Sequence, residues 1–202
     1  MDQFSNESKN SCEPNIDYHS KLIREDQTLL LIIDHQEKLI HKIDGNKLIT
    51  FNIKRLIDSC MLLNVEIAIS EQSPSKLGET SKEILPLKEV MKFEKMEFSC
   101  LNNRTFKNYL NTKNLRNIIL CGIESHICIL QTSLDLLSNN FNVLIPRDAI
   151  GSRNKIDNET AFIRLTSSGA IPSTTEAIIC ELCKNTSRKE FKDISRILKK
   201  TI

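Results

Sequence analysis

The residues from 28 to 34, TLLLIID, form an uninterrupted apolar run that ends in a carboxylate. Further apolar runs of strand length lie at 65–70, 116–122 and 142–148. Patterns typical of amphipathic helices separate them, at 46–64, 104–114 and 125–140. Strands that are apolar without alternation are typical of parallel sheets covered on both faces. The sequence therefore predicts an α/β fold, with a doubly wound, mostly parallel sheet between two layers of helices.

Weaker features complete the expected order of elements. We expect a short strand near 90–93, a helix over 155–169 that Gly169 stops, and a last short strand at 170–174 before two further helices. In a doubly wound sheet, sites form at the carboxyl ends of the strands. The residues that directly follow each apolar run are therefore the first candidates for a site, and they include a carboxylate, a lysine and a cysteine.

Length and charge limit the number of domains and the kinds of partner that we expect for this chain. The 202 residues, of which 40% are hydrophobic, suffice for one domain with a full core, which we place at residues 21–202. Residues 1–20 are polar, and we expect them to form a disordered tail. The 28 basic and 26 acidic residues are interspersed along the chain, so the sequence predicts no nucleic-acid partner.

The sequence carries no signal for a membrane or for secretion. The longest apolar run, at 29–33, is far too short to span a bilayer, and the N-terminus lacks both a cationic start and an apolar segment. The seven cysteines are odd in number and irregularly spaced, which favours reduced thiols in the cytoplasm. Cys180 and Cys183 form a CxxC with no second CxxC or nearby histidine, so we expect two core cysteines and no metal.

Cys128 stands where a strand is expected to turn into a helix, in CGIESHICILQTSLDLL at 121–137. If Ser125 caps that helix, Cys128 lies in its first turn, where free backbone N–H groups favour a thiolate and can hold an oxyanion. Its placement alone fits a small apolar residue facing the sheet equally well. His126 would lie on nearly the opposite face of the helix, which makes it a poor base for Cys128. Cys121, inside the apolar run, is expected in the core.

A carboxylate is therefore the better candidate for the base. Asp34 ends the central apolar run and is expected to be poorly solvated, which raises the pKa of its carboxyl and suits it to accepting a thiol proton. Lys95 would bring positive charge to both groups and lower the pKa of the thiol. The alternatives are a turn-capping role for Asp34 and a solvated surface position for Lys95.

Five segments in order resemble those of a known family: DHQ at 34–36, EQSPSKLGET at 71–80, KMEFS at 95–99, GIESHICILQTSLDLL at 122–137 and RDAIGSR at 147–153. Together they resemble the isochorismatase-like cysteine hydrolase superfamily, and more narrowly its isochorismatase domain-containing branch. The resemblance covers roughly residues 26–200. It implies a Rossmann-like doubly wound fold and a catalytic triad without a cofactor.

Carried over residue by residue, the resemblance makes Asp34, Lys95 and Cys128 that triad. The family commonly has a non-proline cis peptide bond that here corresponds to Ile123–Glu124. This bond would turn the Glu124 N–H toward the site, to form an oxyanion hole with the Cys128 N–H. The resemblance also places Gln36, Gln72 and Ile123 in the substrate-binding pocket.

The chain also departs from parts of the family. Its metal-dependent nicotinamidases carry histidines after the second strand, and 71–80 contains none, which argues against a metal. Members that cleave isochorismate replace the cysteine, so retaining Cys128 favours hydrolysis of a small amide or related acyl compound. The alternative is a catalytically idle member that acts as an oligomeric scaffold, and homo-oligomers are common in the family.

Overall fold

The computed structural model describes residue 19, residues 21–86 and residues 88–202. The tail expected at residues 1–20 therefore lies almost wholly outside the described residues. Among the described residues, no helix has both the length and the apolar composition that crossing a membrane requires.

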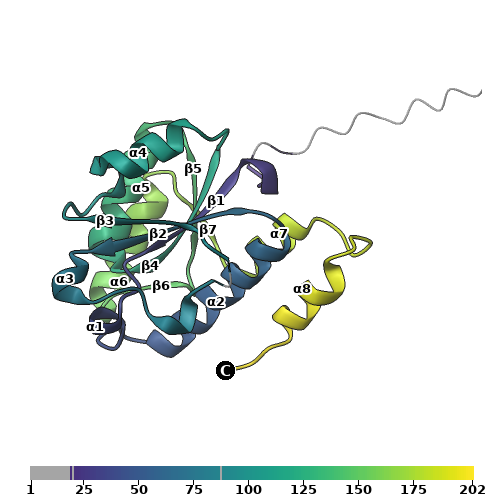
Figure 1. The fold of residues 1–202 in the computed structure, drawn as a ribbon, viewed down its shortest axis with the longest axis horizontal. Coiled ribbons are helices and arrows are strands. Elements are labelled where there is room, and N and C mark those ends of the chain that lie inside the picture. Colours follow the sequence, from purple (N-terminus) through teal and green to yellow (C-terminus); the bar gives the residue numbers. More distant parts are fainter. Residues whose placement is uncertain (1–18, 20, 87) are drawn as a thin grey trace, which may run out of the picture.

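A parallel sheet forms the centre of the fold, as the apolar runs predict (Figure 1). Its strands run in the order β3-β2-β1-β4-β5-β7, and the short β6 pairs with β4. The strands are β1 Thr28–Ile33, β2 Glu66–Gln72, β3 Met91–Lys95, β4 Asn117–Ile123, β5 Asn142–Pro146, β6 Ile150–Gly151 and β7 Ile171–Ser173. The two-residue β6 was not predicted, because a pair of residues carries no periodicity. The strand order reverses between β1 and β4, which makes their carboxyl ends the switch point of the sheet.

Helices cover both faces of the sheet. Figure 1 shows α4 and α5 on one side and α2, α7 and α8 on the other. The helices are α1 Glu37–Ile40, α2 Asn46–Leu62, α3 Pro74–Leu77, α4 Arg104–Asn111, α5 Leu130–Ser138, α6 Lys155–Ser167, α7 Thr175–Cys183 and α8 Phe191–Leu198. The CxxC lies at the end of α7, where Cys183 is buried as expected but Cys180 is exposed, so the expectation of two core cysteines is wrong for Cys180.

The burial of β1 explains why its sequence does not alternate. All six of its residues are buried. Leu30 and Ile32 pack into the cluster formed with α2, α7 and α8. Leu29, Leu31 and Ile33 pack into the cluster formed with α4, α5 and α6. Because both faces of β1 are covered, both sets of positions must be apolar, and the chain after Ile33 is delivered to the switch point.

Candidate active site

Asp34, Lys95 and Cys128 meet at the switch point of the sheet. Asp34 directly follows β1, Lys95 is the last residue of β3, and Cys128 follows β4. All three are buried, with 2%, 2% and 7% of their surface exposed. The sequence predicted these residues as a triad, and the structure brings them together.

Asp34 leaves β1 with φ 51°, in the left-handed region that Asp tolerates better than most residues. Its Oδ1 accepts a hydrogen bond from the Ser70 hydroxyl at 2.7 Å, and its backbone N–H donates to the Ser70 carbonyl. Sequence reasoning missed Ser70. The available signal was a hydroxyl in the run at 65–70, which the sequence predicts as a strand and where a buried polar atom requires a partner.

The Lys95 ammonium donates to three acceptors. Asp34 Oδ2 lies 2.7 Å from Nζ, Gln72 Oε1 lies 2.6 Å away, and Cys128 Sγ lies 3.6 Å away. The Lys95 side chain is fully buried, so the alternative of a solvated surface lysine is wrong. A buried ammonium is tolerated only where its donors are used, and here the protein supplies the acceptors.

Cys128 lies in a π-helix, Ser125–Ile129, that precedes α5. The expected cap by Ser125 is wrong: Glu124 occupies the N-cap position, and the Ser125 hydroxyl is buried without a partner among the described residues. The end of β4 before it requires Gly122, which has φ 112° and leaves no room for a Cβ beside the backbone of Ile33 in β1. π-Helical turns frequently occur at functional sites.

Burial and mutual charge set the protonation of the three groups. Burial raises the pKa of Asp34, although Lys95 and Ser70 act in the opposite direction. Burial alone would lower the pKa of Lys95, but nearby negative charge, that of the Asp34 carboxylate first, outweighs burial and raises this pKa. The Lys95 ammonium is therefore charged at neutral pH.

The pKa of Cys128 is raised well above its ordinary value, by burial first and by the Asp34 charge second. Lys95 lowers this pKa, as expected, but its contribution is smaller. The expectation of a thiol with a lowered pKa is therefore wrong for the site without substrate. The raised pKa keeps the thiol protonated, and the charge of the Asp34 carboxylate contributes to this.

The turn between β4 and the π-helix contains a cis peptide bond at Ile123–Glu124, where the resemblance implied one. The Glu124 side chain accepts hydrogen bonds from the backbone and Nε of Arg153, both at 3.1 Å. The His126 imidazole has a partner elsewhere, since its Nδ1 lies 3.0 Å from the Ser152 hydroxyl. The oxyanion hole of the Glu124 and Cys128 N–H groups stays a prediction.

The three residues expected to bind substrate have partners within the protein. Gln36 is fully buried, and both ends of its amide contact the backbone of Gln72 at the end of β2, while its Nε2 also donates to the Gly78 carbonyl. The Gln72 amide contacts Lys95 and the Met96 carbonyl. The Ile123 side chain packs in the core cluster on the α2 side of the sheet. Their substrate-binding roles stay predictions.

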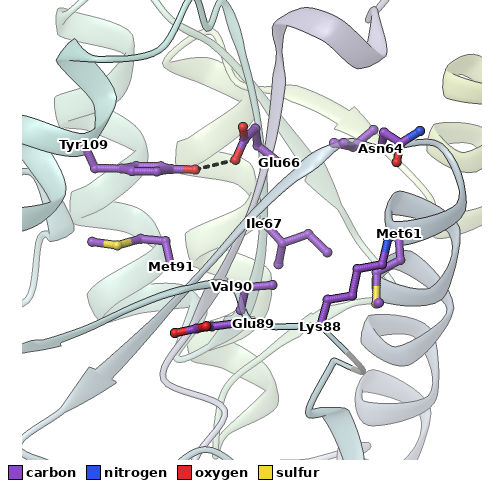
Figure 2. A pocket seen from close by; sticks show the side chains of 10 residues that line it. Met61, Asn64, Glu66, Ile67, Lys88, Glu89, Val90, Met91 and Tyr109 are labelled. Atoms are coloured by element: carbon purple, nitrogen blue, oxygen red, sulfur yellow. Dashed lines mark hydrogen bonds between the residues drawn. The ribbon is translucent and has the colours of Figure 1, made fainter.

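A separate hollow lies at the opposite edge of the sheet, at the amino-terminal ends of β2 and β3 (Figure 2). Its volume is about 310 Å³. Its lining includes Met61, Glu66, Ile67, Val90, Met91 and Tyr109. The Tyr109 hydroxyl donates to Glu66 at 2.8 Å, and Lys113 holds the other Glu66 oxygen at 2.6 Å. Two of its polar side chains, Tyr109 and Glu66, therefore pair with each other, and none of the triad lines this hollow.

Within the part of the chain that the structure describes, no group of three or more His, Cys, Asp or Glu side chains is placed to hold a metal ion. His35, beside Asp34, is instead buried with its Nε2 2.8 Å from the Thr50 hydroxyl of α2.

The fold and this cluster define a doubly wound α/β protein with a buried Asp–Lys–Cys site at its switch point. The chain belongs to the isochorismatase-like hydrolase family: the Isochorismatase domain matches residues 28–177. It is 37% identical over 173 residues to isochorismatase family protein 1A of Dictyostelium discoideum, which covers 83% of this chain and 84% of that protein.

Two further comparisons agree with this family. Isochorismatase domain-containing protein 2 of Xenopus laevis is 32% identical over 174 residues, covering 86% of this chain and 84% of that protein. A structure described as the MAR1 ribonuclease of Caenorhabditis elegans superposes with a TM-score of 0.84 at 32% identity, over 89% of this chain and 93% of that one.

Proposed function

We propose that this chain is a cysteine hydrolase that cleaves an amide or related acyl bond of a small molecule through Asp34, Lys95 and Cys128. The observation that supports it is the contact of one buried ammonium with both a carboxylate and a thiol. The Lys95 Nζ lies 2.7 Å from Asp34 Oδ2 and 3.6 Å from the Cys128 sulfur.

The proposed reaction begins with transfer of the thiol proton to Asp34. Since burial raises the pKa of Asp34, its carboxylate is a stronger base than an exposed one. The sulfur attacks the carbonyl carbon, and the Glu124 and Cys128 N–H groups hold the resulting oxyanion. The tetrahedral intermediate collapses, and the leaving amine takes the proton from Asp34.

Hydrolysis of the thioester completes the cycle. Asp34, again ionised, accepts a proton from an attacking water. The second tetrahedral intermediate releases the carboxylic acid, and the sulfur recovers a proton from Asp34. Lys95 balances negative charge on the carboxylate and on the sulfur at each stage, because its ammonium contacts both.

The test is a panel of primary amides and related acyl compounds, with released ammonia or amine measured for the wild type and for Cys128→Ala. We expect turnover in the wild type and none in Cys128→Ala. Cys60→Ala, which alters a fully buried cysteine of the core on the α2 side, is the matched control and should keep activity. Equal turnover in the wild type and in Cys128→Ala excludes this mechanism.

RNA is the second substrate class to be tested, because the C. elegans relative is described as a ribonuclease. The interspersed charges of this chain, 28 basic and 26 acidic, favour a small molecule instead. Single-stranded and duplex RNA belong in the same panel. Cleavage of RNA that is lost in Cys128→Ala would assign the triad to that substrate.

An idle scaffold is the alternative from another class of protein, and it predicts no turnover with any member of the panel. We propose a homo-oligomer in either case. The YcaC protein of Escherichia coli, which shares the fold with a TM-score of 0.83 at 17% identity, is described as an octameric hydrolase. Light scattering on the purified chain decides this point.

We also propose a cytoplasmic location, since the six cysteines that the structure describes are all free. A relative in Phytophthora sojae, 34% identical over 71% of each chain, is named a secreted effector, so fractionation of expressing cells is the appropriate measurement.

A further inference from the structure

Gln72 supplies one of the shortest contacts in the site. Its Oε1 lies 2.6 Å from Lys95 Nζ, slightly closer than the Asp34 carboxylate at 2.7 Å. Lysine is a long and flexible side chain, and one ion pair fixes the distance of its charge from a partner better than it fixes its direction. With Gln72 on one side and Asp34 on the other, the remaining N–H of the ammonium is directed at the Cys128 sulfur.

The orientation of the Gln72 amide follows from its own contacts. Its Nε2 donates to the carbonyl of Met96 at 2.9 Å, one residue beyond Lys95. The reversed amide would place its NH₂ group against the Lys95 ammonium and its oxygen against the carbonyl, so two donors and two acceptors would face each other. The amide oxygen must therefore point to Lys95.

Gln36 holds Gln72 from the opposite side. Its Oε1 accepts the Gln72 backbone N–H at 2.7 Å, and its Nε2 donates to the Gln72 carbonyl at 3.1 Å and to the Gly78 carbonyl. This pair of contacts fixes the backbone of Gln72 beyond the point where β1 and β2 pair as strands. Since Gln36 is fully buried, the contacts have no competition from water.

We propose that Gln72 is a positioning residue that holds the Lys95 ammonium against the Cys128 sulfur, and that Gln36 positions Gln72. This inference rests on the proposed function, because it assigns Lys95 a role at the thiol. The substrate-binding role that the sequence predicted for both glutamines stays a separate prediction. In this arrangement the Gln72 oxygen accepts from Lys95, and one of the two amide N–H groups donates to Met96.

Two measurements test the proposal, and neither needs a known substrate. The first is the exchange rate of the Lys95 Nζ protons with water, followed by NMR on protein labelled with ¹⁵N-lysine, with Lys95→Met to assign the signal. The second is the pH dependence of Cys128 alkylation, read by mass spectrometry. The charged and titratable groups that act on this thiol are Asp34, Lys95 and Cys100.

We expect Gln72→Met to accelerate exchange of the Lys95 protons and to move the inflection of Cys128 alkylation upward by about one pH unit, which is tenfold less thiolate at a given pH. Gln36→Met should act in the same direction with a smaller shift. Gln72→Glu keeps an oxygen acceptor for Lys95 and should restore slow exchange. Gln131→Met, an exposed glutamine of α5, is the matched control and should change neither measurement.

Gln72→Asn has a side chain one methylene shorter, which moves the amide oxygen away from Lys95. This variant is used instead if Gln72→Met does not fold. Unchanged exchange and an unchanged inflection in a folded Gln72 variant overturn the proposal. The exchange measurement does not depend on turnover. If the Gln72 variants change the exchange of the Lys95 protons but Cys128→Ala keeps normal activity, the positioning role of Gln72 is supported and the proposed function is excluded.

Discussion

The Lys95 ammonium donates to the Asp34 carboxylate at 2.7 Å although the two residues end strands that are not neighbours. Lys95 ends β3, Asp34 follows β1, and β2 lies between them. Adjacent strands are about 4.8 Å apart, so the contact crosses roughly 10 Å of sheet. A long side chain at position 95 is therefore required, and the ion pair closes over the end of β2.

Removing one charge of this pair should be more damaging than removing both. Asp34→Asn leaves the Lys95 ammonium buried without its counter-charge, and Lys95→Met leaves the Asp34 carboxylate in the same position. We expect each to lower the free energy of unfolding by about 3–5 kcal/mol. The double variant buries no charge. Its free energy of unfolding should be no lower than that of the less stable single variant. Urea unfolding of the four proteins at neutral pH measures the coupling.

Lys113→Met is the control, because Lys113 forms a pair of similar length, 2.6 Å, with the half-exposed Glu66. Its removal should cost less than about 1 kcal/mol. Additive losses from the two single variants at positions 34 and 95 would contradict a coupled buried pair.

The order of the strands and helices was predictable because each depends on local periodicity and on burial from both sides. The apolar run at 28–34 and the patterns at 46–64 and 142–148 correspond to β1, α2 and β5. The residues at which the strands end were less predictable. Gln72 was expected beyond the second strand but belongs to β2. The strand extends past its apolar residues because Gln36 accepts the Gln72 backbone N–H and because Gln72 pairs with Lys95 of β3.

The triad was predictable because the carboxyl ends of parallel strands meet, and because the resemblance named its members. The sequence could not reveal the balance of effects on Cys128. Charge from Lys95 was foreseen, but the burial that outweighs it depends on how α5, β3 and β4 pack together. The roles of Ser70 and Gln72 also depend on side-chain contacts across strands that are distant in the chain.

Alkylation of Cys128 in the wild type should continue to accelerate above about pH 8.5, where an ordinary thiol is half ionised. The physical reason is that burial and the Asp34 charge raise the pKa of Cys128. Asp34→Asn removes a charge that raises this pKa, so the inflection should move down. Lys95→Met removes a charge that lowers it, so the inflection should move up.

Site-resolved mass spectrometry at each cysteine provides internal references for this experiment. The exposed Cys180 should react readily and the fully buried Cys121 should not react. An inflection for Cys128 below that of an ordinary thiol would show that the effect of Lys95 on the pKa of Cys128 outweighs those of burial and Asp34.

Gly122→Ala should be severely destabilising. A Cβ at this position would overlap the backbone of Ile33, and the glycine has φ 112°. Because β1 and β4 are paired at this point, neither strand can move away without breaking the centre of the sheet. We expect a loss of more than about 3 kcal/mol in the free energy of unfolding.

Gly45→Ala is the matched control, because Gly45 also has a positive φ of 67° but nothing within 4 Å of its added Cβ. It should cost about 1–2 kcal/mol, the ordinary cost of the left-handed region for a residue with a side chain. Equal losses at both positions would mean that φ alone, and not the approach of β1, requires Gly122.

His35 should make the fold less stable as the pH falls toward 4. Burial lowers the pKa of His35 from 6.5 to about 4, and its Nδ1 is buried without a partner among the described residues. In the unfolded chain this histidine takes up a proton near pH 6.5, whereas in the folded protein it stays neutral until about pH 4. Between these values the unfolded state binds more protons, so the free energy of unfolding decreases as the pH decreases.

Urea unfolding of the wild type and of His35→Gln measures this effect. From about pH 7.5 to about pH 5, we expect the wild type to lose about 2 kcal/mol more than His35→Gln, which has no proton to take up. His41→Gln, which alters an exposed histidine nearby in the chain, should lose stability in parallel with the wild type. Parallel curves for the wild type and His35→Gln would show that His35 can be protonated in the folded protein, and that its contact with Thr50 opens to water.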